Sequence, residues 1–325
     1  MSKDIWVYAE TVDGRLSETV PELLTKAVEL SGKLGGRVAA VLTGSAGAEV
    51  EKTLSDYGAQ AVIIAESEAL ASYSARNYSD ALTQLCRKYE PSIFLFPAGP
   101  IGYEVAPLVM CALGTGLTAD AIDLFVDEDG DFIQTTPGFG GSILAHICIG
   151  EMRPQMVTVR PKVFEPRLAA GKPAAERIVE PVSCEADEAY ELLEVLHGQG
   201  VGAGLKDAKV VVACGRGVKK QEDLELMRRF ADRIGGVLAC SRPLVDCGWL
   251  PHELQIGQSG CTVKADVIIN IGISGSTQYL AGMQNSKCII SINTNESAPI
   301  MAASHYSLAA DYRKLIPALL AKLGG

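Results

Sequence analysis

Glycine-marked turns and uncharged polar side chains gather between residues 240 and 299, around two apolar runs at 267–271 and 288–292. Glycines let backbone N–H groups approach an anion closely, and parallel α/β sheets bind ligands where their strands end. Hydroxyls, amides and a guanidinium suit a large ligand with phosphates and a polar heteroaromatic ring, such as a dinucleotide. One such turn marks a loop in any α/β domain, whereas three in this stretch indicate a site. The residues concerned are Gly257, Gly260, Gly272, Gly275 and Gly282, with Arg242, Gln255, Gln258, Ser259, Ser274, Ser276, Gln278 and Asn293.

Groups arranged for covalent or metal chemistry are missing from this pattern. His252 is the histidine of the stretch, and it has no motif partner that would make it a catalytic base. The nine cysteines include no CxxC pair and the four histidines no HExxH spacing, so we expect no metal, no disulfide framework and no catalytic residue. The run Gly215-Arg216-Gly217 lacks the third glycine of the common dinucleotide fingerprint. The stretch therefore indicates binding and not covalent catalysis.

Length and composition limit the class of protein. A chain of 325 residues is long enough for two hydrophobic cores. Its net charge of −10 argues against a nucleic-acid partner, because an acidic surface repels phosphate backbones. No apolar run approaches the roughly 18 residues of a membrane span, and the first residues lack the pattern of a signal peptide. We therefore expect a cytoplasmic protein without membrane insertion.

Apolar runs alternate with amphipathic segments along both halves of the chain, which predicts parallel sheets covered by helices. Four short runs between 122 and 159 predict antiparallel strands that end the first domain. Residues 165–205 are rich in proline, small and acidic residues, and we predict a linker there. The predicted domains are therefore 1–164, which is α/β with added antiparallel strands, and 206–325, which is α/β and carries the glycine-marked turns.

Four motifs occur in an order and spacing that resemble the FAD-binding region of the electron-transfer flavoprotein alpha subunit: SRPLVDCGWLP, QIGQSG, GISGSTQYLAGM and IISINTNESAPI. The runs LGTGLTAD, GFGGS and RPQMVTVRP resemble the N-terminal region of the same subunits. The resemblance thus covers nearly the whole chain. It implies an N-terminal nucleotide-hydrolase-like domain that contacts a partner subunit, and a C-terminal Rossmann-like domain that binds FAD.

The resemblance also implies roles for single residues. Arg216 would contact the FAD, Arg242 would lie beside the isoalloxazine, and Ser259 would place a hydroxyl near the flavin N5. The turn at 274–276, at the start of a helix predicted for 276–284, would hold the pyrophosphate. The full set of implied FAD-binding residues is Arg216, Ser241, Arg242, Gln255, Ile256, Gly257, Gln258, Ser259, Gly272, Ser274, Gly275, Ser276, Gln278, Tyr279, Asn293, Asp311 and Tyr312.

Two short stretches depart from the family pattern. Tyr279 stands where the family usually has histidine, and we expect its hydroxyl to donate a hydrogen bond to the N1/C2 carbonyl edge of the flavin. Residues 304–307 read SHYS where the family usually has ADYG. We expect the second departure to affect only the closing loop.

The function implied by the resemblance is that of an electron carrier. Such a chain pairs with an electron-transfer flavoprotein beta subunit, which carries AMP or a second FAD. The pair takes electrons from NADH or from a flavin dehydrogenase such as acyl-CoA dehydrogenase, as in fatty acid β-oxidation, and passes them to another dehydrogenase or a quinone reductase. The sequence leaves open whether this pair bifurcates electrons. The alternative is an NAD-dependent transferase or deacetylase, which would need a catalytic base and, in deacetylases, zinc-binding cysteines.

Overall fold

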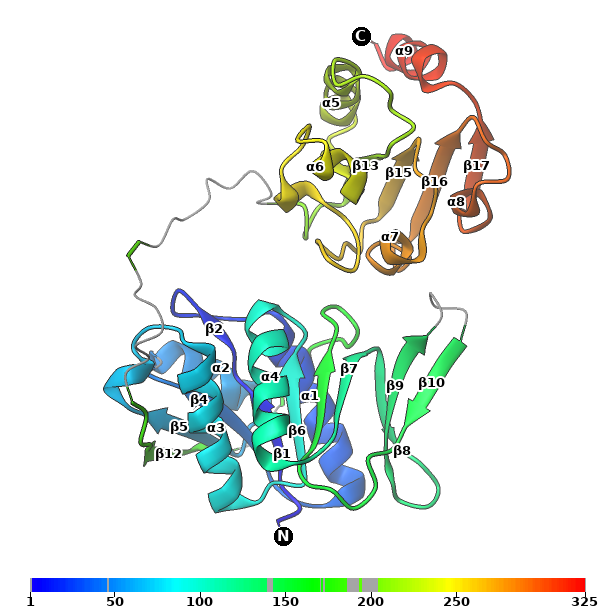
Figure 1. Ribbon diagram of the computed structural model, residues 1–325. Coiled ribbons are helices and arrows are strands. Elements are labelled where there is room, and N and C mark those ends of the chain that lie inside the picture. The colour runs from blue at the N-terminus through cyan, green and yellow to red at the C-terminus, as the bar shows by residue number, and fades with distance from the viewer. Residues whose placement is uncertain are drawn as a thin grey trace. The chain divides into compact units, whose positions relative to one another are not determined.

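Two compact units, Met1–Val195 and Leu196–Gly325, make up the chain in the computed structural model (Figure 1). The structure describes residues 2–45, 47–138, 143–169, 171, 173–185, 193–194 and 204–324. Both units combine helices with parallel sheets, which confirms the predicted α/β class. Within these ranges no helix is long and apolar enough to cross a membrane.

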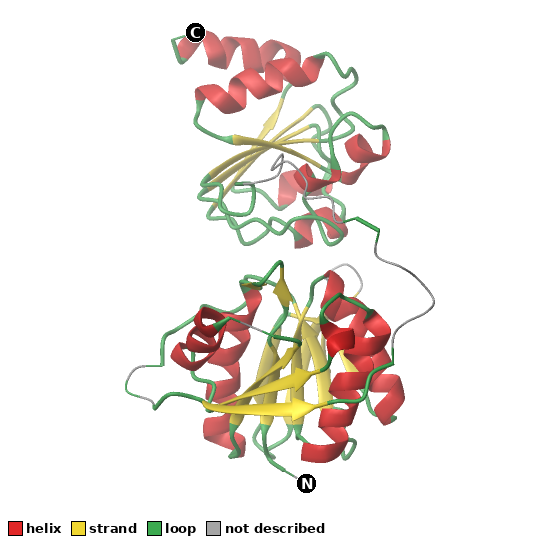
Figure 2. Cartoon of the chain, turned by 90° about the vertical axis from the view of Figure 1, so that its left-hand side faces the viewer, coloured by secondary structure: helices red, strands yellow, loops and turns green. Residues whose placement is uncertain are grey.

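A seven-stranded sheet forms the first unit, in the order β12-β5-β4-β1-β6-β11-β7, and each neighbouring pair is parallel. The central strands are largely apolar and buried because helices cover both faces of the sheet (Figure 2). The strands are β1 (Ile5–Tyr8), β4 (Val38–Thr43), β5 (Ala61–Glu66), β6 (Ile93–Pro97), β7 (Leu117–Ala121), β11 (Gln155–Val159) and β12 (Glu176–Pro181).

Successive side chains of β1 point to opposite faces of this sheet and pack in a different hydrophobic core on each face. Ile5 and Val7 pack in the cluster that includes the apolar face of α1, whereas Trp6 and Tyr8 pack in the cluster that includes α3 and α4. The helices are α1 (Thr19–Leu34), α2 (Ala48–Asp56), α3 (Ala75–Tyr89) and α4 (Pro100–Leu113), with a short 3₁₀ helix η1 (Glu68–Leu70). Each core therefore takes every second residue of the same strand.

Two strands of the first unit differ from the sequence prediction. β11 was expected in an antiparallel sheet but lies between β6 and β7 and is parallel to both. β12 lies inside the predicted linker but pairs with β5 at the edge of the sheet. β12 reads ERIVEP, and an edge strand of this kind needs no long apolar run. The predicted antiparallel strands are present as β8 (Asp123–Val126), β9 (Phe132–Gly138) and β10 (Ile143–Ile147), and β2 (Thr11–Val12) pairs with β3 (Arg15–Leu16).

A five-stranded parallel sheet in the order β14-β13-β15-β16-β17 forms the second unit. The order reverses between β13 and β15, and α/β sheets bind ligands outside the carboxyl ends of the strands at such a switch point. The strands are β13 (Val210–Cys214), β14 (Val237–Cys240), β15 (Val267–Ile271), β16 (Cys288–Asn293) and β17 (Tyr306–Ala309).

The helices of the second unit are α5 (Asp223–Arg233), α6 (Arg242–Asp246), α7 (Thr277–Ala281), α8 (Pro299–Ala302) and α9 (Tyr312–Lys322), with η3 (His252–Leu254). α5 and α9 pack together, and the Tyr312 hydroxyl donates to Asp223 at 2.6 Å. α7 is shorter than the predicted 276–284 and ends at Ala281, with Gly282 as its C-cap. A Cβ at Gly282 would lie 2.5 Å from the backbone N of Gly257, so this glycine lets the two loops touch.

Glu10 fills the N-terminus of α4 in the first unit. Its side chain is buried, and its Oε2 accepts the backbone N–H of Gly102 at 3.1 Å. A carboxylate suits this place because the N-terminus of a helix carries partial positive charge. Burial nevertheless raises the pKa of Glu10 to about 6. The glycine-containing loop before α4 therefore holds a side chain of its own unit and does not have the form of an open phosphate loop.

Glu10→Gln should make the stability of the first unit depend less on pH. The pKa of about 6 in the fold exceeds the ordinary 4.5, so the protonated carboxyl stabilises the fold relative to the unfolded chain. This contribution, roughly 2 kcal/mol, is fully present below about pH 4.5 and is lost as the pH rises through about 6.

Denaturant unfolding between pH 4.5 and 7.5 measures this difference through the fluorescence of the buried Trp6 in a Trp249→Phe background. The free energy of unfolding of Glu10→Gln should fall less across the window than that of the parent. Glu128→Gln, on an exposed turn, removes the same charge and should behave like the parent. Equal pH dependence in the Glu10 variant and the parent would show that Glu10 does not titrate in this way.

Candidate functional site

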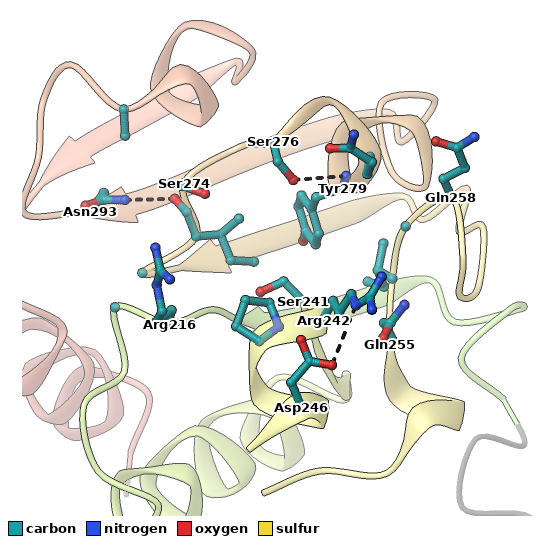
Figure 3. A pocket seen from close by; sticks show the side chains of 18 of the residues that line it. Arg216, Ser241, Arg242, Asp246, Gln255, Gln258, Ser274, Ser276, Tyr279 and Asn293 are labelled. Carbon is teal, nitrogen blue, oxygen red and sulfur yellow. Dashed lines mark hydrogen bonds and ion pairs between the residues drawn. The ribbon is translucent and has the colours of Figure 1, made fainter. Parts of the chain in front are cut away.

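A cavity of about 580 Å³ lies at the carboxyl ends of β13, β14, β15 and β16 in the second unit (Figure 3). Each of these strands runs directly into a segment that lines it: Arg216 follows β13, Ser241 follows β14, Ser274 follows β15, and Asn293 ends β16. The loop at 255–259 closes another side. The cavity is therefore built at the switch point of the sheet.

Most of the residues predicted to bind FAD line this one cavity: Arg216, Ser241, Arg242, Gln255, Ile256, Gly257, Gln258, Ser259, Gly272, Ser274, Ser276, Gln278, Tyr279 and Asn293. Gly275, Asp311 and Tyr312 are not in its lining. Asp311 accepts the N–H of Arg313 at 2.9 Å and so caps α9, whereas Tyr312 ties α9 to α5. The lining residues that the sequence prediction missed are Gly217, Lys219, Pro243, Asp246, Ile273, Asn295 and Ala298.

Two glycines bring the turns after β13 and β15 into direct backbone contact. The N–H of Gly217 donates to the carbonyl of Gly272 at 2.8 Å. A Cβ at Gly217 would lie 2.5 Å from the Cα of Gly272, and Gly272 itself has a φ of 63°. Any larger residue at either position would push the turns apart. This contact puts Arg216 on the same side of the cavity as Ser274 (Figure 3).

The turn at 274–276 presents backbone donors. Among the residues that the structure describes, the N–H groups of Ser274, Gly275 and Ser276 have no protein acceptor. Gly275 has a φ of 85°, and a Cβ there would lie 2.4 Å from the backbone N of Ile300. The Ser276 side chain accepts the N–H of Tyr279 at 3.4 Å and so caps α7. Because α7 is so short, the turn offers an anion these local N–H groups more than a helix dipole.

Three cationic side chains lie around the cavity: Arg216, Lys219 and Arg242. Arg216 is exposed, and Figure 3 shows it pointing toward Ser274 and Asn293. The Arg242 Nε lies 3.5 Å from Asp246 Oδ1, and these side chains are 70% and 60% exposed. An ion pair this exposed contributes little to stability, so Arg242 can exchange Asp246 for an anionic ligand at small cost. Asp246 could have been found from its i,i+4 spacing to Arg242.

Side-chain amides and hydroxyls form the opposite wall. Gln255 donates to the Ser259 hydroxyl at 3.1 Å, and the N–H of Gln258 donates to the carbonyl of Gln278 at 2.8 Å. These bonds connect the 255–259 loop internally and to α7. His252 lies outside the lining, and its Nε2 contacts the backbone oxygen of Ser259 at 3.0 Å. No base therefore stands beside a nucleophile in this wall.

Tyr279 differs from its expected role. Its side chain is buried, and its hydroxyl donates to Asn270 Oδ1 at 2.5 Å. The hydrogen that was expected to reach the flavin is thus committed to a protein acceptor. Burial raises the pKa of this hydroxyl well above its ordinary value, and the nearby Cys214 and Cys240 raise it further. Tyr279 is therefore a neutral group whose hydrogen is already used.

The donor set fits FAD. Open backbone N–H groups and exposed cationic side chains suit a pyrophosphate, amides and hydroxyls suit ribityl and ring polar atoms, and the buried Ile256 and Tyr279 offer apolar surface to a ring. No group of three His, Cys, Asp or Glu side chains in the described ranges could hold a metal ion. The geometry can hold a large anionic cofactor and has no catalytic constellation of its own.

Comparison with known proteins identifies a family for both units. The family described as "Electron transfer flavoprotein domain" matches residues 5–183, and "Electron transfer flavoprotein FAD-binding domain" matches residues 204–284.

Curated relatives match along nearly the whole chain. "Electron transfer flavoprotein subunit alpha" of Thermoanaerobacterium thermosaccharolyticum is 36% identical over 99% of this chain and 98% of its own. "Protein FixB" of Clostridium saccharobutylicum is 38% identical over 98% of this chain and 96% of its own. "Lactate dehydrogenase (NAD(+),ferredoxin) subunit LctC" of Acetobacterium woodii is 37% identical over 99% and 77%. These matches confirm the resemblance read from the motifs, and the alternative of a transferase or deacetylase is not favoured. The chain belongs to the electron transfer flavoprotein alpha subunit family and is an FAD-binding subunit for electron transfer.

Proposed function

We propose that the cavity at the carboxyl ends of β13 and β15 holds the FAD of this subunit. The observation that carries the proposal is the convergence of Arg216 with the open N–H groups of 274–276, opposite a wall of amides at 255–259. Its volume of about 580 Å³ lies within the usual range of ligand pockets. Arg216 and the 274–276 turn would hold the phosphates, and the 255–259 loop with Tyr279 would hold the ring.

The bound flavin supplies the redox chemistry, and the chain supplies binding, orientation and electrostatics. Arg242 is a fixed positive charge on the rim that favours negative charge on a ligand nearby. Its exposure of 70% leaves that rim open to solvent and to a partner protein. Tyr279 and Ile256 are buried and keep water from the floor of the cavity. No residue of the site has to move a proton in this scheme.

As an alpha subunit, the chain works with an electron transfer flavoprotein beta subunit and with dehydrogenases. We propose a heterodimer that takes electrons from a flavin dehydrogenase such as acyl-CoA dehydrogenase, which would make it part of fatty acid β-oxidation. A second candidate follows from the similarity to the LctC subunit, whose name includes NAD(+) and ferredoxin. In that case the heterodimer would exchange electrons with NADH and ferredoxin.

Reduction by alternative donors separates these two candidates. The purified heterodimer should lose its visible flavin absorbance when an acyl-CoA and catalytic acyl-CoA dehydrogenase are added, and NADH alone should leave the absorbance unchanged. Rapid bleaching by NADH would favour the second candidate and contradict the first.

Arg216→Ala should weaken FAD binding. A hydrogen bond to a charged group contributes about 1.5–3 kcal/mol, so its loss should raise the dissociation constant roughly 10- to 150-fold. Titration of the apo-heterodimer with FAD, followed by flavin fluorescence, measures the constant. Arg229→Ala removes an exposed arginine from α5, away from the cavity, and should leave it unchanged. Equal constants for the two variants would remove Arg216 from the site.

Gly272→Ala should destabilise the second unit and abolish tight FAD binding. Its φ of 63° already disfavours alanine, and the new Cβ would lie 2.8 Å from the Cα of Gly217. Gly248 is a matched control, because its φ is 70° but no atom lies within 4 Å of its Cβ position. We expect a loss of about 1–2 kcal/mol for Gly248→Ala and more than about 3 kcal/mol for Gly272→Ala in urea unfolding. Similar losses would mean that the backbone contact carries no steric constraint.

A further inference from the structure

A continuous line of hydrogen bonds runs from Tyr279 through the interior of the second sheet to α8. The Tyr279 hydroxyl bonds to Asn270 Oδ1 at 2.5 Å, and Asn270 Nδ2 lies 3.3 Å from Ser291 Oγ. Ser291 Oγ lies 2.7 Å from Ser304 Oγ, which in turn lies 2.7 Å from the backbone oxygen of Ile300. The line thus joins the wall of the cavity to a backbone carbonyl at its far end.

The far end fixes the direction of the hydrogen bonds between the serines. A carbonyl only accepts, so Ser304 gives its single hydroxyl hydrogen to Ile300. Ser291 must then donate to Ser304, and the oxygen of Ser291 is left to accept from Asn270. Each hydrogen therefore points away from the cavity.

The orientation of the Asn270 amide follows from a second carbonyl. Asn270 Nδ2 also donates to the backbone oxygen of Ile290 at 3.4 Å. With the amide turned over, its oxygen would face that carbonyl and the line would break, so the observed orientation is the one that satisfies every group. Asn270 then offers Tyr279 an oxygen, and the Tyr279 hydroxyl has to be the donor.

Burial makes this arrangement hard to replace. Asn270 is 1% exposed, Ser291 is 0% exposed and Tyr279 is 4% exposed. Ser304 is half-buried, but for these three side chains water is not at hand to substitute for a missing partner, and a buried polar group without a partner is costly. The line is therefore held as a unit and not as separate surface bonds.

The end of the line is also tied to the phosphate side of the cavity. The N–H of Ile300 donates to the carbonyl of Ser274 at 3.1 Å. Its backbone also fills the space beside Gly275, where a Cβ would lie 2.4 Å away. The residue that ends the hydrogen-bond line thus supports the 274–276 turn, so both walls of the cavity share one buried support.

We propose that Asn270, Ser291 and Ser304 are positioning residues that hold Tyr279 so that it can accept, but not donate, a hydrogen bond to the bound flavin. The proposal rests on the function proposed above, in which the flavin occupies this cavity. Tyr279 then meets the flavin with its ring and an oxygen lone pair, and its hydrogen never reaches a flavin carbonyl. Ser304 acts on Tyr279 only through Ser291 and Asn270.

Vibrational spectra of the FAD-loaded heterodimer test the orientation of the hydroxyl. A donor to a flavin carbonyl lowers the stretching frequency of that carbonyl. Tyr279→Phe should therefore leave the infrared carbonyl bands of bound FAD where they are in the parent. An upward shift of a carbonyl band in Tyr279→Phe would show that the hydroxyl donates to the flavin and would overturn the proposal.

A double-mutant cycle tests the positioning role. Tyr279→Phe and Ser304→Ala should each raise the dissociation constant for FAD about fivefold, and the double variant should be no worse than either, because each change breaks the same line. Ser304→Thr keeps the hydroxyl and should restore binding. Ser307→Ala, on exposed β17, is the control and should have no effect. The coupling between Ser304 and Tyr279 would be overturned if the increases in the dissociation constant multiplied in the double variant. It would also be overturned if Ser304→Ala left the dissociation constant unchanged.

Arg216→Ala in the same titration separates this proposal from the one on which it rests. Weaker binding in Arg216→Ala with no change in the Tyr279 and Ser304 variants would leave the FAD site standing and overturn the positioning role. No change in any of the three would mean that the flavin does not occupy this cavity, and both proposals would fall.

Discussion

The backbone contact between Gly217 and Gly272 is the constraint on which the second unit depends. The two turns can donate and accept across 2.8 Å only because neither position carries a side chain. The strand order creates a crevice between β13 and β15, and this contact joins the turns that follow these two strands. Arg216 and the 274–276 turn then face the same space. Because Gly217 and Gly272 lack Cβ atoms, the crevice that this fold forms at its switch point has a defined shape here.

The two units treat the carboxyl ends of their parallel strands in different ways. In the first unit Glu10 supplies a carboxylate to the N-terminus of α4, and burial raises its pKa to about 6. In the second unit the 274–276 turn has open N–H groups and no carboxylate of its own. The same architecture therefore has a helix N-terminus that is capped by a side chain of its own unit in one case, and open N–H groups beside a cavity in the other. This difference agrees with the FAD-binding family match lying in residues 204–284.

The sequence was informative where the signal is local. Glycines, serines and amides that follow short apolar runs predicted most of the cavity lining, because the carboxyl ends of parallel strands converge. Contacts between distant residues were not predictable in this way. Asp311 and Tyr312 stay predicted ligands that do not line this cavity; Asp311 caps α9, and Tyr312 joins it to Asp223. β11 pairs with strands on either side of it only after a long excursion through β8–β10, and no local pattern encodes that order.

The two departures from the family pattern also depend on contacts between distant residues, which local sequence patterns do not predict. Tyr279 and Ser304 lie in separate stretches of the sequence, and each was interpreted alone. In the fold both belong to one hydrogen-bond line, which runs from Tyr279 through Asn270 and Ser291 to Ser304. Because the line ends on the carbonyl of Ile300, a backbone group in α8 decides which way the hydrogen of a cavity residue points. The polarity that this wall offers to a flavin is therefore set by the direction of the whole line, and not by the identity of residue 279 alone.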